Sequence, residues 1–122
     1  LHYQLCDGKA DIHSKNLSLT SDFEGNSQVK LQCFTDKETI LKEEEGWFST
    51  AYRQRTKRVA LSFNTGKKDK ETIRFITVIY PSKNKKDFPD MKARIKNTDQ
   101  KQQSIEIEVI INGSKQLLKY QL

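Results

Sequence analysis

Apolar and polar residues alternate along much of this chain, which is the pattern of a β-strand with one buried face. The alternation is cleanest in Ile105-Glu106-Ile107-Glu108-Val109-Ile110-Ile111, where the odd-numbered positions are apolar. Asn112-Gly113 follows directly and favours a type I′ turn, because both central residues of that turn need positive φ. We therefore predict a β-hairpin that matches apolar with apolar and acid with base: Ile107 with Leu118, Ile105 with Tyr120, and Glu106 with Lys119.

The same alternation predicts further strands, separated by turn-rich pieces at intervals of roughly 8–12 residues. These strands cover 1–6, 10–13, 17–21, 28–34, 38–43, 58–64, 71–80 and 91–96. No stretch holds an apolar stripe of helical period long enough to predict a helix. The fold class predicted is all-β: an antiparallel β-sandwich of about 8–10 short strands with no substantial helix, in which residues 1–122 form a single domain.

The strand predicted over 72–80 differs from the others, because apolar residues occupy both of its faces. Ile73, Phe75 and Ile79 lie on one side, and Ile76, Val78 and Tyr80 on the other. A strand with one solvated face would alternate cleanly. We therefore expect a central strand that is covered on both faces, either by a second sheet and a loop or by a neighbouring domain.

Composition adds a basic charge balance to this picture. The net charge is +6, the pI is about 9.3 and the mean hydropathy is −0.80. Such a balance favours anionic partners, which include nucleic acid, anionic lipid and acidic polysaccharide. Because the chain opens at Leu1 within a predicted strand and without Met, we expect it to be a fragment of a larger multidomain protein.

The cysteines and histidines say little about chemistry. Cys6 and Cys33 allow one disulfide or none, and the alternation places them on opposite faces of their strands, which weakly disfavours a bridge. His2 and His13 have no further ligand at zinc spacing. No phosphate-binding glycine loop, nucleophile motif or reactive cysteine is evident, so we predict no metal, no cofactor and no catalytic residue in this chain.

The strongest candidate for a binding site is the stretch Gly46–Gly66, where aromatic and basic residues lie together. The candidate substrate-binding residues are Trp47, Tyr52, Arg53, Arg55, Lys57 and Arg58. Arginine forks suit carboxylates and sulfates, and aromatic rings suit the apolar faces of sugars. The alternative is that the charges are only solvated and that Trp47 seals one end of the sandwich.

The alternation in this stretch conflicts with a single straight strand. Arg53, Arg55 and Lys57 would share one face with Val59, Leu61 and Phe63, and charged and core residues do not share a face. We therefore predict a bulge or turn near Thr56–Arg58, which makes 47–57 a loop or short edge element. Loops on a rigid β scaffold often hold functional residues.

Two stretches resemble the C-terminal β region of the heparinase II/III-like polysaccharide lyases, of the heparinase III or heparan sulfate lyase type. They are Gly46-Trp47-Phe48-Ser49-Thr50-Ala51-Tyr52 and Phe75-Ile76-Thr77-Val78-Ile79-Tyr80-Pro81. The family shows Gly-Trp-x-Ser-x-x-Tyr, followed further along by a strand of the Phe-x-Thr-x-x-Tyr-Pro kind. Leu1-His2-Tyr3-Gln4-Leu5 resembles another strand of that region. The resemblance is good over 46–81, looser over 1–34 and thin beyond 82.

The resemblance implies a bacterial protein, secreted or periplasmic, in which an N-terminal (α/α) toroid precedes the β region. Such enzymes cleave acidic polysaccharides by β-elimination: a base removes the C5 proton, the carboxylate charge is neutralised, and an acid protonates the leaving oxygen. No residue here matches the family's catalytic residues, so the chain alone is expected to be inactive. Its partners would be the toroid, the remaining β region and an acidic polysaccharide, with no nucleic acid and no membrane.

Two other functions remain open at this point. The first is a stand-alone carbohydrate-binding or surface adhesion module, which a long helical region upstream would argue against. The second is a nucleic-acid-binding domain, which ranks lower because the basic residues lie in no recognised motif of that kind. The basic continuation Arg53–Arg58 departs from the lyase pattern, so sugar contact there is a hypothesis for this sequence only.

Overall fold

The computed structural model describes residues 1–5, 9–22, 27–83, 88–99, 101 and 103–121, and it confirms the all-β prediction. Within these residues, one 3₁₀ turn, η1 (Ser14–Asn16), accompanies ten strands. The strands are β1 (His2–Gln4), β2 (Ala10–His13), β3 (Ser18–Asp22), β4 (Gln28–Phe34), β5 (Thr39–Phe48), β6 (Thr56–Thr65), β7 (Ile76–Ser82), β8 (Met91–Asp99), β9 (Ser104–Ile111) and β10 (Ser114–Gln121).

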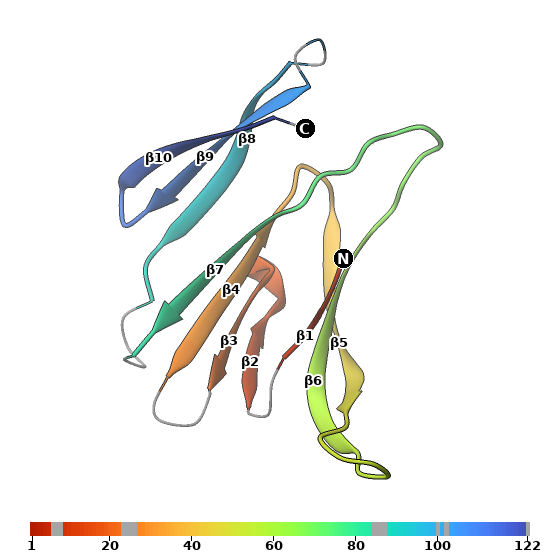
Figure 1. The fold of residues 1–122 in the computed structure, drawn as a ribbon. Coiled ribbons are helices and arrows are strands. Elements are labelled where there is room, and N and C mark those ends of the chain that lie inside the picture. The colour runs from red at the N-terminus through yellow and green to blue at the C-terminus, as the bar shows by residue number, and fades with distance from the viewer. Residues whose placement is uncertain (6–8, 23–26, 84–87, 100, 102, 122) are drawn as a thin grey trace.

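The strands form three antiparallel sheets. Their strand orders are β2-β3-β4-β7, β1-β6-β5 and β10-β9-β8, and in Figure 1 the four-stranded sheet lies between the other two. The first two sheets enclose the main core. The third sheet lies on the far side of β7 and touches the rest of the fold mainly through β8.

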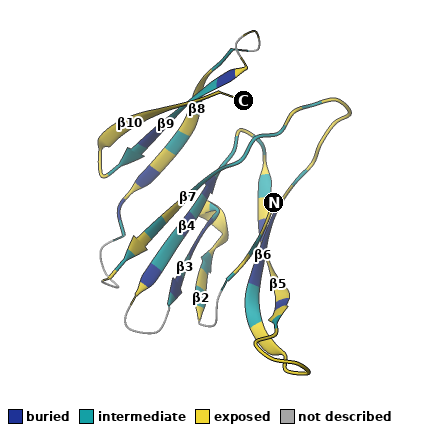
Figure 2. Cartoon of the chain, in the orientation of Figure 1, coloured by how far each residue is buried: buried dark blue, intermediate teal, exposed yellow. Residues whose placement is uncertain are grey.

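The main core joins residues that alternate inward from both layers. Leu19, Leu31 and Cys33 come from the four-stranded sheet, and Leu41, Leu61 and Phe63 come from the sheet of β1, β6 and β5. Each is at most 5% exposed, and Figure 2 shows this burial along β3, β4 and β6. Burying one side chain of this kind stabilises a fold by about 1.5–3 kcal/mol, so this layer holds the two sheets together.

The chain's first strand is fixed to this core at the edge of β6. Tyr3 packs edge-on against Phe63, with ring centroids 6.1 Å apart. The amino group of Leu1 donates to the carbonyl of Phe63 at 3.1 Å, and the amide of Phe63 donates to the carbonyl of Leu1 at 2.8 Å. The Cys33 thiol is buried and free, burial raises its pKa, and Cys6 lies outside the described residues.

The hairpin of β9 and β10 has the predicted register. Ile107 pairs with Leu118, Ile105 with Tyr120, and Glu106 with Lys119. Asn112 and Gly113 have φ values of 48° and 79°, as a type I′ turn requires. The Lys119 ammonium lies 3.7 Å from the Glu106 carboxylate. The turn and the alternation were sufficient to predict this hairpin.

The prediction of a central strand over 72–80 is wrong. β7 begins at Ile76 and, among the strands that the structure describes, is the last of its sheet and pairs only with β4; Ile79 is 57% exposed. The apolar residues of β7, together with Phe75 directly before it, contact two layers of the fold. Phe75 packs against the main core, and 75–79 also line a hollow of about 430 Å³ whose opposite wall is β9 and β10. A facing sheet therefore explains the apolar pattern that suggested central pairing.

The bulge predicted near Thr56–Arg58 is also wrong. β5 and β6 pair without a register shift from Thr39 opposite Thr65 to Phe48 opposite Thr56, so only 49–55 form the loop. Lys57 does share a face with Leu61 and Phe63. However, the strand extends beyond the core, and its charged end stands in solvent (Figure 2). Length, rather than a bulge, separates the charged residues from the core ones.

Candidate functional site

The six residues predicted as a binding site lie at one end of the β5–β6 hairpin, which we call the hairpin tip (residues 46–58). Trp47 is the last residue but one of β5, Lys57 and Arg58 follow the first residue of β6, and Tyr52, Arg53 and Arg55 lie in the loop. The loop turns tightly: the Gln54 amide donates to the carbonyl of Ala51 at 3.1 Å, and Arg53 has a φ of 64°. The structure therefore brings all six residues into one region.

Gly46 lets the two strands of the hairpin tip approach each other. A Cβ at this position would lie 3.0 Å from the Ala60 Cβ, 3.0 Å from the Arg58 carbonyl oxygen and 3.1 Å from the Arg58 Cγ. A side chain here would collide with both backbone and side chain of β6. The glycine of the Gly-Trp stretch thus has a structural reason, which is to make room for the stem of Arg58.

Most cations of the hairpin tip already have partners in this chain. The Lys57 ammonium lies 2.9 Å from the Glu45 carboxylate, whose hydrogen bond raises the pKa of Lys57. The Arg58 guanidinium lies over the ring of Phe48 at 5.6 Å, and that of Arg53 over Tyr52 at 5.2 Å. Such cation–π contacts hold a guanidinium beside an aromatic ring while leaving its edge able to donate.

The side chains open to a ligand are therefore fewer than the sequence suggested. Tyr52 is 87% exposed and Trp47 is 48% exposed. Arg55 is exposed and has no ion pair among the residues that the structure describes. Two aromatic rings with Arg53 and Arg55 can stack on a sugar and bind its sulfate or carboxylate groups. The Glu43–Glu45 run on β5 offsets part of this charge.

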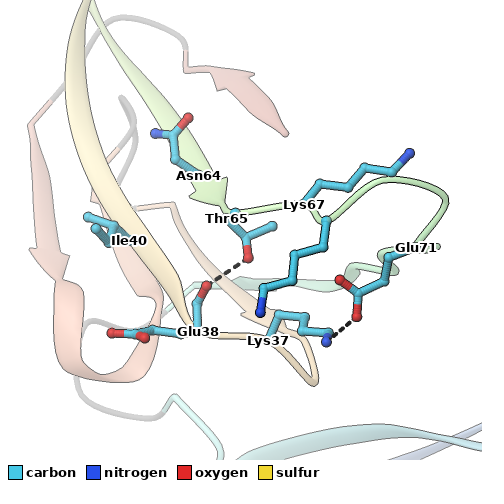
Figure 3. A pocket seen from close by; sticks show the side chains of 9 residues that line it. Lys37, Glu38, Ile40, Asn64, Thr65, Lys67 and Glu71 are labelled. Carbon is cyan, nitrogen blue, oxygen red and sulfur yellow. Dashed lines mark hydrogen bonds and ion pairs between the residues drawn. The ribbon is translucent and has the colours of Figure 1, made fainter.

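A second feature, which the sequence analysis did not single out, is a hollow at the other end of the same hairpin (Figure 3). It measures about 710 Å³ and is lined by Lys37, Glu38, Ile40, Asn64, Thr65, Gly66, Lys67, Lys68 and Glu71. Lys37 and Glu71 form an ion pair, which raises the pKa of Lys37 and lowers that of Glu71. The Thr65 hydroxyl donates to the carbonyl of Glu38 at 2.7 Å.

The lining of this hollow is held together by its own ion pair and hydrogen bond and does not form a reactive centre. Its carboxylate from Glu71 already bonds a lysine, and its lining contains neither histidine nor cysteine. The only sequence signal for it was the lysine-rich turn that follows β6. Lys67 and Lys68 add positive charge at its rim, and the charge of Lys67 contributes to the lowered pKa of Glu71.

The two histidines are exposed and stand apart from any cluster of metal ligands in the described part of the chain. His2 lies 3.4 Å from Glu44, and both side chains are exposed by nearly half. Among the residues described, no three histidine, cysteine or carboxylate side chains gather as metal ligands would. Within the same residues, no helix has the length and apolar content to cross a membrane.

Comparison with known proteins gives the chain its relatives. No family model matches it. A heparin-sulfate lyase of Bacteroides stercoris is 43% identical over 122 residues, which is 100% of this chain and 18% of that protein. A heparin-sulfate lyase of Pedobacter heparinus is 31% identical over 97% of this chain and 18% of its own length. This chain is homologous to a segment of heparinase III-type lyases.

Solved structures agree with that relationship. A heparinase III gene product superposes with a TM-score of 0.90 at 44% identity, over 100% of this chain and 19% of that one. The heparan sulfate lyase of Pedobacter heparinus superposes with a TM-score of 0.84 at 25% identity, over 99% of this chain and 19% of that one. The resemblance inferred from Gly46–Tyr52 and Phe75–Pro81 is thus confirmed. The chain spans less than a fifth of the length of these much longer relatives.

Proposed function

We propose that this chain acts as a non-catalytic β domain of a lyase that cleaves heparan sulfate or a similar sulfated uronate polysaccharide. The observation that supports this most is its match, over its whole length, to a small segment of a heparin-sulfate lyase at 43% identity. A segment that keeps its fold inside a much longer enzyme serves that enzyme by support or by contact with its substrate. The contacts and charges of the described residues fit either role.

Cleavage itself would depend on groups outside this chain. β-Elimination needs a base for the C5 proton, a neutraliser for the carboxylate, and an acid for the leaving oxygen. His2, the histidine nearest to a charged partner, lies beside an exposed glutamate in solvent. We infer that an N-terminal (α/α) toroid and the remaining β region supply these groups, and that they are the partners of this domain.

The hairpin tip is the part of the domain that we expect to contact polysaccharide. Its loop extends beyond the core, so an elongated polymer can reach it (Figure 1). Arg53 and Arg55 would bind sulfate or carboxylate groups, Trp47 and Tyr52 would stack on sugar rings, and Lys57 and Arg58 would add longer-range attraction. Since such polymers occur outside cells, we also propose a secreted or periplasmic location in a bacterium.

A chimeric enzyme tests this proposal. The matching segment of the Bacteroides stercoris lyase is replaced by this chain, and cleavage of heparan sulfate is followed by the ultraviolet absorbance of the double bond that elimination creates. We expect the chimera to cleave heparan sulfate, while the isolated chain shows no cleavage. The parent lyase without the segment is the control and should lose activity.

Two outcomes would contradict the proposal. One is a folded chimera that binds heparan sulfate and leaves it intact, which would favour a stand-alone carbohydrate-binding module. The other is cleavage by the isolated chain, which would require a catalytic site among residues now assigned only structural contacts.

A further inference from the structure

The sheet of β8, β9 and β10 has two unlike faces. One face, with Ile107, Val109 and Leu118, points toward β7 and lines the hollow described above. The other face points outward, because residues alternate across a sheet. It presents five cations from its two outer strands: Lys92, Arg94, Lys96, Lys115 and Lys119. Between these cations lie Glu106, Glu108 and Ile110 on β9 and Leu117 on β10.

Glu108 lies at the centre of this outward face. Its side chain is 1% exposed, whereas those of Arg94, Lys96 and Lys115 are 68%, 52% and 60% exposed. Arg94 donates from Nε at 2.8 Å and from Nη2 at 2.7 Å to Glu108 Oε1. The ammonium groups of Lys115 and Lys96 lie 3.1 Å and 3.9 Å from Glu108 Oε2. The bonds from Lys115 and Arg94 hold the pKa of Glu108 below its usual value.

This arrangement gathers three cationic groups around one covered carboxylate. Like charges at this spacing repel each other, and Glu108 offsets one of the three charges while fixing their positions. The carboxylate is hidden beneath the long side chains, so solvent meets mainly the cations. The cluster therefore keeps an excess of positive charge where a ligand can reach it.

A bulge in β8 increases the polar content of the outward face. The register with β9 shifts between Ile95 and Asn97, so Lys96 and Asn97 lie next to each other opposite Glu106. Strict alternation would have turned Asn97 toward β7. The bulge thus widens the polar surface at the point where Lys96 approaches Glu108.

The size and composition of the outward face indicate a polymeric anion without bases. Strand spacing and rise give the cationic area an extent of about 10 Å by 13 Å. No aromatic side chain lies on this face among the described residues, since Tyr120 is on the opposite one. Base stacking, on which single-stranded nucleic acid binding depends, has no platform here. Sulfate and carboxylate groups need only donors and charge, which the lysines and Arg94 supply.

We propose that the outward face of β8–β10, centred on Arg94, Lys96 and Lys115 around Glu108, is a second binding surface for sulfated uronate polysaccharide, separate from the hairpin tip. The choice of sulfated uronate polysaccharide as the ligand of this surface rests on the proposed function. Two separated surfaces on one domain would hold a long chain at two points, and each would raise the effective concentration of polymer at the other.

The test measures binding of heparan sulfate oligosaccharides to this 122-residue chain over a series of salt concentrations. The variant Lys96→Gln/Lys115→Gln leaves Arg94 to pair with Glu108, so the carboxylate keeps a partner. The control variant Lys9→Gln/Lys15→Gln removes the same charge from exposed lysines near β2. Circular dichroism and size-exclusion chromatography establish that each variant is folded and monomeric.

We expect the Lys96→Gln/Lys115→Gln variant to bind roughly three- to thirty-fold more weakly than the control variant, as the loss of two exposed charge contacts implies. Its affinity should also depend less steeply on salt concentration. Equal affinity of the two variants would overturn the proposal. So would tighter binding of a single-stranded oligonucleotide than of heparan sulfate by the unsubstituted chain. Either result leaves cleavage by the chimera untouched, so failure here is distinguishable from failure of the proposed function.

Discussion

The hairpin tip and the outward face of β8–β10 both contain several cations, yet they use them differently. At the hairpin tip, Lys57 bonds Glu45, Arg53 lies over Tyr52 of the same loop, and Arg58 lies over Phe48 of the neighbouring strand. On the outward face, three cations share one covered carboxylate and remain more than half exposed. Three cations of the outward face therefore surround a single carboxylate, whereas three of the four at the hairpin tip have separate partners.

The two regions differ in which elements of the fold supply the partners of their cations. Residues close in sequence at the hairpin tip meet acids and rings of the adjoining strand, which satisfy them locally. On the outward face, Arg94 and Lys115 belong to strands that are joined only through β9, and their convergence depends on cross-strand register. Cross-strand neighbours, rather than sequence neighbours, decide what a sheet presents to a ligand.

The largest expected effect is a loss of stability from a substitution at the hairpin tip, which leaves the residues of the outward face unchanged. In Gly46→Val the new side chain collides with Ala60 and with the backbone of Arg58, and overpacking of this kind costs about 1–3 kcal/mol. The free energy of unfolding, measured in urea, should fall by that amount. Gly66→Val is the control, because a Cβ there meets nothing within 4 Å. Equal effects of the two substitutions would contradict the close approach of β5 and β6.

A second prediction concerns Glu108 and pH. Because the folded-state pKa of Glu108 lies below its ordinary value of 4.5, its contribution to stability is present above that pH and is lost as pH falls through the folded pKa. Unfolding free energies at about pH 7 and about pH 3 should therefore differ less in Glu108→Gln than in the unsubstituted chain.

Glu38→Gln is the control for this prediction, since it removes an exposed carboxylate elsewhere. It should leave the difference between the two pH values as it is in the unsubstituted chain. An acid sensitivity that persists fully in Glu108→Gln would show that Glu108 does not organise the cations of the outward face.

The smallest expected effect concerns binding at the hairpin tip. Arg53→Ala/Arg55→Ala should weaken binding of heparan sulfate by roughly three- to thirty-fold, because two exposed donors are lost. Glu45→Gln should act in the opposite direction and strengthen binding slightly, since it releases Lys57 from its partner. Titration calorimetry measures both, with alginate and a neutral glucan as comparison polymers. Unchanged affinity in the arginine variant would leave the hairpin tip with a structural role only.

Local signals in the sequence predicted much of the fold. Asn112-Gly113 and the flanking alternation fixed the β9–β10 register, because a two-residue turn leaves no freedom in pairing. The resemblance at Gly46–Tyr52 led to the correct relatives. In these cases the information lies within a few residues of where it is used.

The errors arose where the outcome depends on distant layers. The apolar residues of β7 suggested central pairing, but a facing sheet covers them, and alternation cannot distinguish the two. The charged start of β6 suggested a bulge, because the sequence does not show where the core ends along a strand. The Glu108 cluster was missed since it requires the register of β8 and its irregularity at Ile95–Asn97.

Two lysines of the outward face, Lys115 and Lys119, also lie on the exposed edge strand β10. β10 is the last strand of its sheet, all of its residues are exposed, and Leu117 and Leu118 lie at its middle. An unpaired apolar edge of this kind invites a second chain to add a strand, and lysines on an edge oppose such pairing. Lys115 and Lys119 flank the two leucines, and their charges oppose the pairing of a second chain with this edge. Neutralising both lysines together would therefore favour association through this edge, whereas Lys119 stays in place in Lys96→Gln/Lys115→Gln.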